Sequence, residues 1–108
     1  MHSTLLVARM EPQDASAVAR LFGEFDRTEM PSLMGTKRRQ LFRFQGLYFH
    51  LQDFDTDDGG EKIEATKTHP SFVQISDDLK QFITAYDPET WRTPKDAIAQ
   101  RFYHWTAG

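Results

Sequence analysis

The sequence of 108 residues lacks several features that define common protein classes. It contains no cysteine, which excludes a disulfide framework and thiol chemistry. Its first thirty residues hold only one short apolar run, Leu5–Ala8, which is too short for a signal peptide or a membrane-spanning helix. The net charge of −3 argues against a basic surface of the kind that binds nucleic acid. We therefore expect a soluble, cytoplasmic protein that binds neither nucleic acid nor membrane.

Common motifs for phosphates, nucleophiles and metals are also missing. The sequence has no glycine-rich phosphate loop and no nucleophile elbow, and its four histidines show no close metal-ligand spacing. The acidic loop Asp53–Gly60 mimics part of a calcium-binding loop, but Asp58 stands where such a loop requires glycine. We interpret this loop as a solvated segment in which Asp57 or Asp58 caps the next helix. No metal and no cofactor is expected.

The most informative segment that is present is Thr36–Phe54, TKRRQLFRFQGLYFHLQDF. It has the alternation of two β-strands joined by a turn that contains glycine. If Phe44 pairs with Leu47, alternation gives the hairpin two chemically different faces. One face carries Arg39, Leu41, Arg43, Tyr48, His50 and Gln52, and the other carries Phe42, Phe44, Leu47, Phe49 and Leu51. The first face has the composition of a binding or catalytic site, and the second has the composition of a packing surface.

The rest of the chain predicts the order β-α-β-β-α-β in a single domain, residues 1–108. A strand over Thr4–Met10 precedes a helix that starts at Glu11, and Ala97–Thr106 is predicted to be the last strand. The second helical region is predicted in two pieces, Glu61–Lys67 and a longer helix from Pro70 whose apolar positions extend to Tyr86. This order is typical of the α+β ferredoxin-like fold, in which helices cover one face of a four-stranded antiparallel sheet. The nine phenylalanines help so small a chain to bury apolar area.

Asp26 indicates which face of the hairpin points toward the helices. It follows Phe22 by four residues and Val18 by eight, so it lies at the edge of the apolar stripe of the first helix. A carboxylate at this position points toward the sheet, where Arg39 and His50 are suitable partners. The Phe-rich face would then be left for a second copy of the chain, because monomers rarely expose such a patch. We therefore expect a homodimer.

Four segments resemble a known family, the small aromatic polyketide cyclases of bacterial type II pathways (tetracenomycin-cyclase-like). They are LFRFQGLYFHL, RMEP, EFDRTEMP and RFYHWTA, and the likeness spans nearly the whole chain. GLYFHLQDF and ITAYDPETW are most similar to the spore-pigment branch. The resemblance implies a ferredoxin-like, dimeric α-β barrel-like homodimer with an internal cavity and no cofactor. It also implies that Asp26, Arg39 and His50 take part in the chemistry. One departure is Phe25, where the tetracenomycin type has histidine.

The implied reaction is the intramolecular aldol cyclisation and aromatisation of a poly-β-ketone, or of a partly cyclised polyketide, either free or delivered by an acyl carrier protein. His50 could act as base and acid, since its ordinary pKa of about 6.5 lies near the working pH. Arg39 could stabilise the developing oxyanion, and Asp26 could orient Arg39 or His50 or act as the base. Residues expected to bind substrate are Arg43, Tyr48, Gln52 and Phe25. The alternatives are a cofactor-free monooxygenase, which the same fold also hosts, and a non-catalytic binding protein or chaperone.

Overall fold

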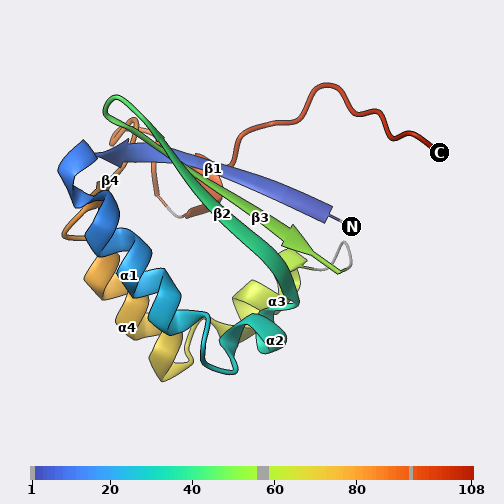
Figure 1. The fold of residues 1–108 in the computed structure, drawn as a ribbon, viewed down its shortest axis with the longest axis horizontal. Helices are drawn as coiled ribbons and strands as arrows, with labels where there is room; N and C mark the ends of the chain where they lie inside the picture. The colour runs from blue at the N-terminus through green and yellow to red at the C-terminus, as the bar shows by residue number, and fades with distance from the viewer. Residues whose placement is uncertain (1, 56–58, 93) are drawn as a thin grey trace.

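The computed structural model describes residues 2–55, 59–92 and 94–108. Within these ranges one antiparallel sheet has the strand order β2-β3-β1-β4, and the helices lie on one of its faces (Figure 1). This is the predicted ferredoxin-like arrangement. The strands are β1 (His2–Met10), β2 (Thr36–Phe44), β3 (Leu47–Phe54) and β4 (Ile83–Thr84). The helices are η1 (Pro12–Asp14), α1 (Ala15–Phe25), α2 (Met30–Met34), α3 (Gly59–Thr66), α4 (Pro70–Leu79) and η2 (Pro94–Ala97).

The β2–β3 hairpin has the predicted register. Phe44 pairs with Leu47, and Arg39 pairs with Gln52, so the two faces are those expected from alternation. The inner face, which packs against the helices, includes Tyr48, Gln52 and Phe54, all buried. Side chains on the outer face include Phe42 and Phe44, which remain largely exposed in the single chain.

An irregularity at the start of β2 shifts its register with β3 before the pair Arg39–Gln52. The register shifts between Thr36 and Arg38, so that Thr36 lies opposite Phe54 while Arg38 lies opposite Asp53. Lys37 is therefore the extra residue of a β-bulge. Its ammonium group lies 3.4 Å from the carboxylate of Asp55, whereas the hydroxyl of Thr36 accepts a hydrogen bond from the buried amide of Gln52 at 2.6 Å.

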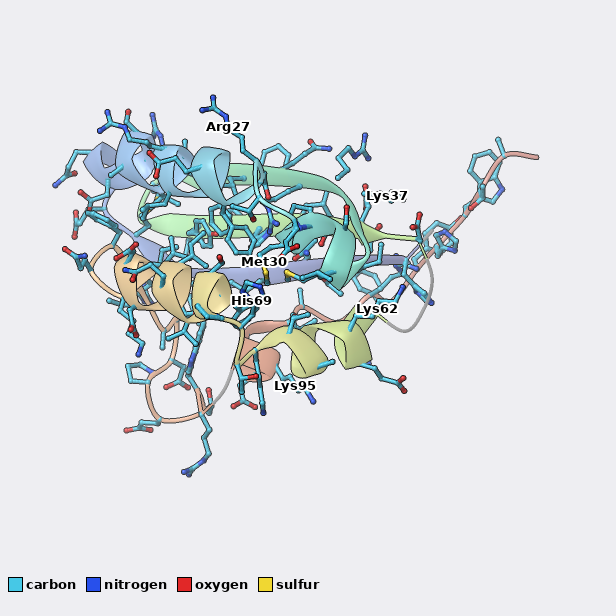
Figure 2. The ribbon with its side chains drawn as sticks, turned by 90° about the horizontal axis from the view of Figure 1, so that it is seen from below. Arg27, Met30, Lys37, Lys62, His69 and Lys95 are labelled. Atoms are coloured by element: carbon cyan, nitrogen blue, oxygen red, sulfur yellow. The ribbon has the colours of Figure 1, made fainter. Side chains whose placement is uncertain are left out.

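Helices α1 and α4 lie side by side against the sheet, and α2 and α3 lie together near its other end (Figure 1). The predicted apolar stripe of α1 is confirmed, because Val18, Phe22 and Phe25 are buried. Helix α2 was not predicted. Its Met30 and Met34 are buried in the same core, and Met30 lies near the centre of the molecule in Figure 2.

The C-terminal third differs from the sequence prediction in two places. The helix from Pro70 ends at Leu79 rather than near Tyr86, because Ile83 leaves it to pair with Met10 as the short strand β4. The predicted last strand, Ala97–Thr106, is also wrong. Only Ile98 forms a bridge, with Leu6, and the chain beyond Ala99 extends away from the sheet (Figure 1). Alternating aromatic residues favour a strand, but a strand also needs a partner backbone. The start of this segment has one, since Ile98 bridges Leu6 and the N–H of Ala99 donates to the carbonyl of Leu5, whereas the residues beyond Ala99 pair with no described strand.

One sequence-based expectation depends on residues that the structure does not describe. Asp57 and Asp58, the predicted helix caps, lie outside the described residues. Across the described ranges, no helix has the length and apolar character needed to cross a membrane.

A buried carboxylate on the outer face ties three strands together. Asp53 of β3 is 3% exposed, and it accepts hydrogen bonds from Ser3 of β1 and, at 2.9 Å, from Nε of Arg38 of β2. The hydrogen bond from Ser3 is the main cause that lowers the pKa of Asp53, burial opposes it, and Arg38 lowers the pKa further. Folding therefore favours the ionised carboxylate.

We expect Asp53→Ala to lower the free energy of unfolding at pH 7 by about 1.5–3 kcal/mol, the range for hydrogen bonds to charged groups. Since the pKa is lowered on folding, this stabilisation is present above the ordinary pKa of an aspartate and is lost as the pH falls through the lower folded value. Urea denaturation at pH 7 and pH 3 measures the difference. Asp55→Ala, which removes an exposed ion pair, is the control and should cost less than about 1 kcal/mol. An equal loss from Asp53→Ala at both pH values would contradict this account.

Candidate active site

The inner face of the hairpin holds a buried arginine that binds a carboxylate from helix α1. The Arg39 side chain is only 6% exposed. Its Nε lies 3.2 and 3.1 Å from the two oxygens of Asp26, and its Nη2 donates to Oδ1 at 2.9 Å. Asp26 immediately follows α1, and its backbone N–H still bonds to the carbonyl of Phe22. A carboxylate is disfavoured at a helix C-terminus and a cation is favoured there, so Arg39 offsets the unfavourable position of Asp26.

His50 completes the polar cluster from the neighbouring strand β3. Its Nε2 lies 2.9 Å from Nη1 of Arg39. An arginine can only donate, so Nε2 must accept, and the proton of the neutral ring is therefore on Nδ1. Burial lowers the pKa of His50 to about 3, and the positive charge of Arg39 contributes to the shift. His50 is thus neutral at physiological pH and is a weak base while Arg39 occupies Nε2.

Aromatic rings enclose the apolar side of this cluster. Cζ of Arg39 lies 4.8 Å from the ring centroid of Phe22 and 5.6 Å from that of Phe25. The ring of Phe22 also meets the imidazole of His50 edge-on, with centroids 5.1 Å apart. These contacts are in the range of cation–π and aromatic pairing, and they are strengthened by the exclusion of water.

The predicted site residues fall into two groups. Arg39 contacts both Asp26 and His50, as expected from the position of Asp26 on the helix stripe. Phe25 contacts Arg39, and Tyr48 is buried with its ring 6.3 Å from that of His50. Burial raises the pKa of Tyr48, and the charge of Arg39 opposes this only in part, so the phenol remains protonated and can donate.

Gln52 and Arg43 are placed differently from the cluster. The amide of Gln52 is occupied by the hydroxyl of Thr36 within the sheet. Arg43 is exposed near the hairpin turn, opposite Tyr48 in the register. Sequence reasoning assigned Phe22 only to the core. The spacing of four residues between Phe22 and Asp26 was the available indication that its ring would also reach the site.

Metal ligands are not gathered at this site or elsewhere in the described ranges. No group of three or more histidine, aspartate or glutamate side chains that could hold a metal is found in residues 2–55, 59–92 and 94–108. Two hollows, of about 170 and 300 Å³, are lined by other parts of the chain. One lies beside Trp91 and the other between α1 and α4, and neither is lined by Arg39 or His50.

Comparison with known proteins assigns the chain to a family. The sequence model of the family described as "Polyketide synthesis cyclase" matches residues 2–106. The chain belongs to this family. The expected enzyme class is confirmed, and the protein is a polyketide cyclase of the type II kind.

Two relatives and one solved structure support the assignment. Tetracenomycin F2 cyclase of Streptomyces glaucescens is 42% identical over 106 residues, which cover 98% of this chain and 95% of the relative. Polyketide synthase CurG of Streptomyces cyaneus is 39% identical over 97% of both chains. The solved structure of tetracenomycin F2 cyclase, described as a type-II polyketide cyclase, superposes with a TM-score of 0.92 at 41% identity and full coverage of both chains.

More distant structures share the fold alone. A putative antibiotic biosynthesis monooxygenase from Nitrosomonas europaea has a TM-score of 0.56 at 11% identity, over 80% of each chain. At this identity the likeness says nothing about the reaction of the cyclase.

We expect the ring of His50 to stay neutral, with its proton on Nδ1, from pH 8 to pH 5. Histidine ¹⁵N spectra measure both the tautomer and the titration. Because the folded pKa, about 3, lies below the ordinary 6.5, the neutral ring stabilises the fold above pH 6.5. This stabilisation is lost as the pH falls from 6.5 toward 3.

The variant Arg39→Gln is the informative comparison for this titration. It removes the positive charge but leaves much of the burial, so the pKa of His50 should rise without necessarily reaching 6.5. A wild-type ring that titrates near pH 6.5, or that carries its proton on Nε2, would contradict the geometry of the cluster.

Proposed function

We propose that the protein closes a ring in a poly-β-ketone, or in a partly cyclised polyketide, by an intramolecular aldol condensation. The observation that supports this reaction is the buried guanidinium of Arg39 held between Asp26 and His50, in a member of a polyketide cyclase family. An aldol step needs a base for an acidic methylene and a stabiliser for enolate oxygen. Both are within one cluster here.

Arg39 has the role of oxyanion stabiliser in this proposal. An arginine side chain has five N–H groups, and three of them point to Asp26 and His50 among the described residues. Two N–H groups therefore remain to donate to substrate oxygens. The enolate of a β-dicarbonyl spreads its charge over two oxygens, which suits a planar cation with two donors in fixed positions.

Asp26 takes the role of base, which the sequence left open between His50 and Asp26. The His50 ring is neutral, and its Nε2 accepts from Arg39. Asp26 also accepts from Arg39, but 38% of its side chain is exposed, so a substrate can reach the remaining lone pairs of its carboxylate. The carboxylate removes a proton from the methylene between two carbonyls, and the enolate carbon forms the new bond to a distant carbonyl carbon. This bond closes the ring, and the alkoxide receives a proton. The hydroxyl then leaves as water together with a proton from the neighbouring carbon, which forms a double bond of the aromatic ring. Tyr48 and the Nδ1–H of His50 are the donors available nearby.

Substrate approach is proposed from the side of Asp26, the most open part of the cluster. The exposed carboxylate lies at the end of α1, while Arg39 is almost fully covered. Phe25 borders Arg39 at 5.6 Å and would contact the aromatic part of the substrate. Such contacts hold the two reacting carbons together, which contributes to the rate independently of proton transfer.

The test is reconstitution with a minimal type II polyketide synthase, with products compared with and without the protein. We expect Arg39→Gln to slow ring closure by roughly 10²–10³-fold, the usual loss for one oxyanion donor, and Asp26→Asn to have an effect of similar size. Arg27→Gln is the matched control, because Arg27 is the next residue but its side chain points away from the sheet (Figure 2). It should act like wild type.

The other outcomes separate the alternative functions. Oxygen consumption with an anthrone-like substrate would indicate a monooxygenase. An unchanged product distribution in Arg39→Gln and Asp26→Asn, with altered products in Phe25→Ala, would indicate a chaperone that acts by shape. Products that are the same with and without the protein would exclude the cyclase reaction.

We also propose a homodimer that buries the outer face of the sheet. Phe42 and Phe44 are 49% and 63% exposed there, beside Leu47, Phe49 and Leu51 of β3. Stable interfaces bury about 800 Å² on each partner, and a contiguous aromatic patch on a sheet can supply such an area. Three further aromatic residues stand exposed on the C-terminal segment, namely Phe102, Tyr103 and Trp105.

Phe42→Ser is expected to shift the protein from dimer to monomer in light scattering coupled to size exclusion. The reason is that the ring is about half exposed in one chain and would be buried only in the dimer. Val73→Ser is the control, since Val73 is 45% exposed on helix α4, on the other side of the sheet. A wild-type protein that is monomeric at micromolar concentration would refute the dimer.

Two finer assignments belong to the same proposal. We place the pathway in spore-pigment biosynthesis because the sequences of residues 46–54 and 83–91 resemble that branch of the family. The substrate is either free or bound to an acyl carrier protein, and parallel assays with both forms distinguish these cases.

A further inference from the structure

Phe22 is the aromatic residue that joins the two halves of the polar cluster. Its ring, 7% exposed, lies 4.8 Å from Cζ of Arg39 and 5.1 Å from the ring of His50, measured at the centroids. Two other aromatic rings, those of Phe25 and Tyr48, each contact only one of these two groups. Phe25 makes a ring contact with Arg39, and Tyr48 makes one with His50. Phe22 alone among these three rings contacts both groups.

The hydrogen bonds of Arg39 restrain its guanidinium poorly against movement out of the plane of that group. Its bonds to Asp26 and His50 follow N–H directions, which lie in the plane of the guanidinium. They limit sliding within the plane better than displacement out of it. The carbon at the centre of that group lies over the ring of Phe22, 4.8 Å from its centroid, so the ring limits movement of the group toward α1.

The backbone of Phe22 is coupled to the same cluster. The N–H of Asp26 donates to the carbonyl of Phe22 at 2.8 Å, so the ring and the carboxylate are fixed on the last turn of α1. Arg39 comes from β2 and His50 from β3. A single helical turn thus meets two strands through one aromatic ring and one carboxylate.

We propose that Phe22 is a positioning residue for ring closure, which holds the guanidinium of Arg39 against His50 and so keeps its two remaining N–H groups aimed at the substrate. This inference rests on the proposed function of Arg39. Phe22 transfers no proton and forms no bond. Its effect is on how often the donors are correctly placed, which bears on kcat more than on KM.

The decisive variant is Phe22→Leu, which keeps an apolar side chain and removes the ring. We expect kcat to fall roughly tenfold, the equivalent of a partly desolvated cation–π contact, with KM changed much less. Phe22→Tyr, which restores the ring, should recover most of the loss. Val18→Ala is the control for simple destabilisation, since Val18 is buried on the same helix and belongs to the core rather than to the polar cluster.

A second measurement does not depend on activity. In ¹⁵N spectra of Phe22→Leu, the Nε2 resonance of His50 should move away from its wild-type position as the contact with Arg39 loosens, whereas Val18→Ala should leave it in place. If Phe22→Leu does not fold, Phe22→Met supplies the same comparison with a long apolar side chain.

The outcomes separate this inference from the proposed function. A folded Phe22→Leu or Phe22→Met with wild-type kcat and an unchanged Nε2 resonance overturns the positioning role. A moved resonance in a protein whose Arg39→Gln variant cyclises normally supports the positioning of Arg39, and refutes the catalytic proposal instead. Equal losses of kcat in Phe22→Leu and Val18→Ala, with the resonance unchanged in both, would show a stability effect and also overturn the inference.

Discussion

The structure depends on the placement of one cation inside the protein. Arg39 is almost fully buried, and a buried charge is costly unless it is paired and hydrogen-bonded. Here a carboxylate neutralises it, an imidazole accepts its remaining inward N–H, and two phenylalanine rings pack against it. The cluster crosses the space between helix α1 and strands β2 and β3, so the same contacts that form the candidate site also fix the helix against the sheet.

The neutral state of His50 follows from this arrangement. An imidazole near a buried cation cannot easily become a second cation, and burial acts in the same direction. The histidine therefore serves as an acceptor for Arg39 and as a donor through Nδ1. In the proposed reaction, the base is the carboxylate, which is the more exposed member of the cluster. The division of roles is set by environment rather than by the ordinary pKa of each residue type.

Much of the fold and of the cluster could be predicted because it depends on short-range patterns. Alternation around the glycine-containing turn specified the hairpin register, and the spacing from Phe22 to Asp26 specified which face meets the helix. Other features depend on partners distant in sequence. Strand β4 exists because Ile83 meets Met10, and the residues after Ala99 form no strand because they lie beside none of the described strands. The lowered pKa of His50 likewise required knowledge of burial and of which nitrogen faces Arg39. Phe22 looked like any other core position.

The bulge at the start of β2 has a consequence for the electrostatics of the inner face. The strand begins with three consecutive cations, Lys37, Arg38 and Arg39. In a regular strand Lys37 would share the face of Arg39, two residues away. The bulge instead turns Lys37 toward Asp55 and brings the neutral hydroxyl of Thr36 to Gln52. Of these three cations, only Arg39 therefore lies beside Asp26 and His50. One irregular residue thus gives the cluster on the inner face one cation, Arg39, and one carboxylate, Asp26. A further change in the charge of this cluster would have to come from a molecule that binds there.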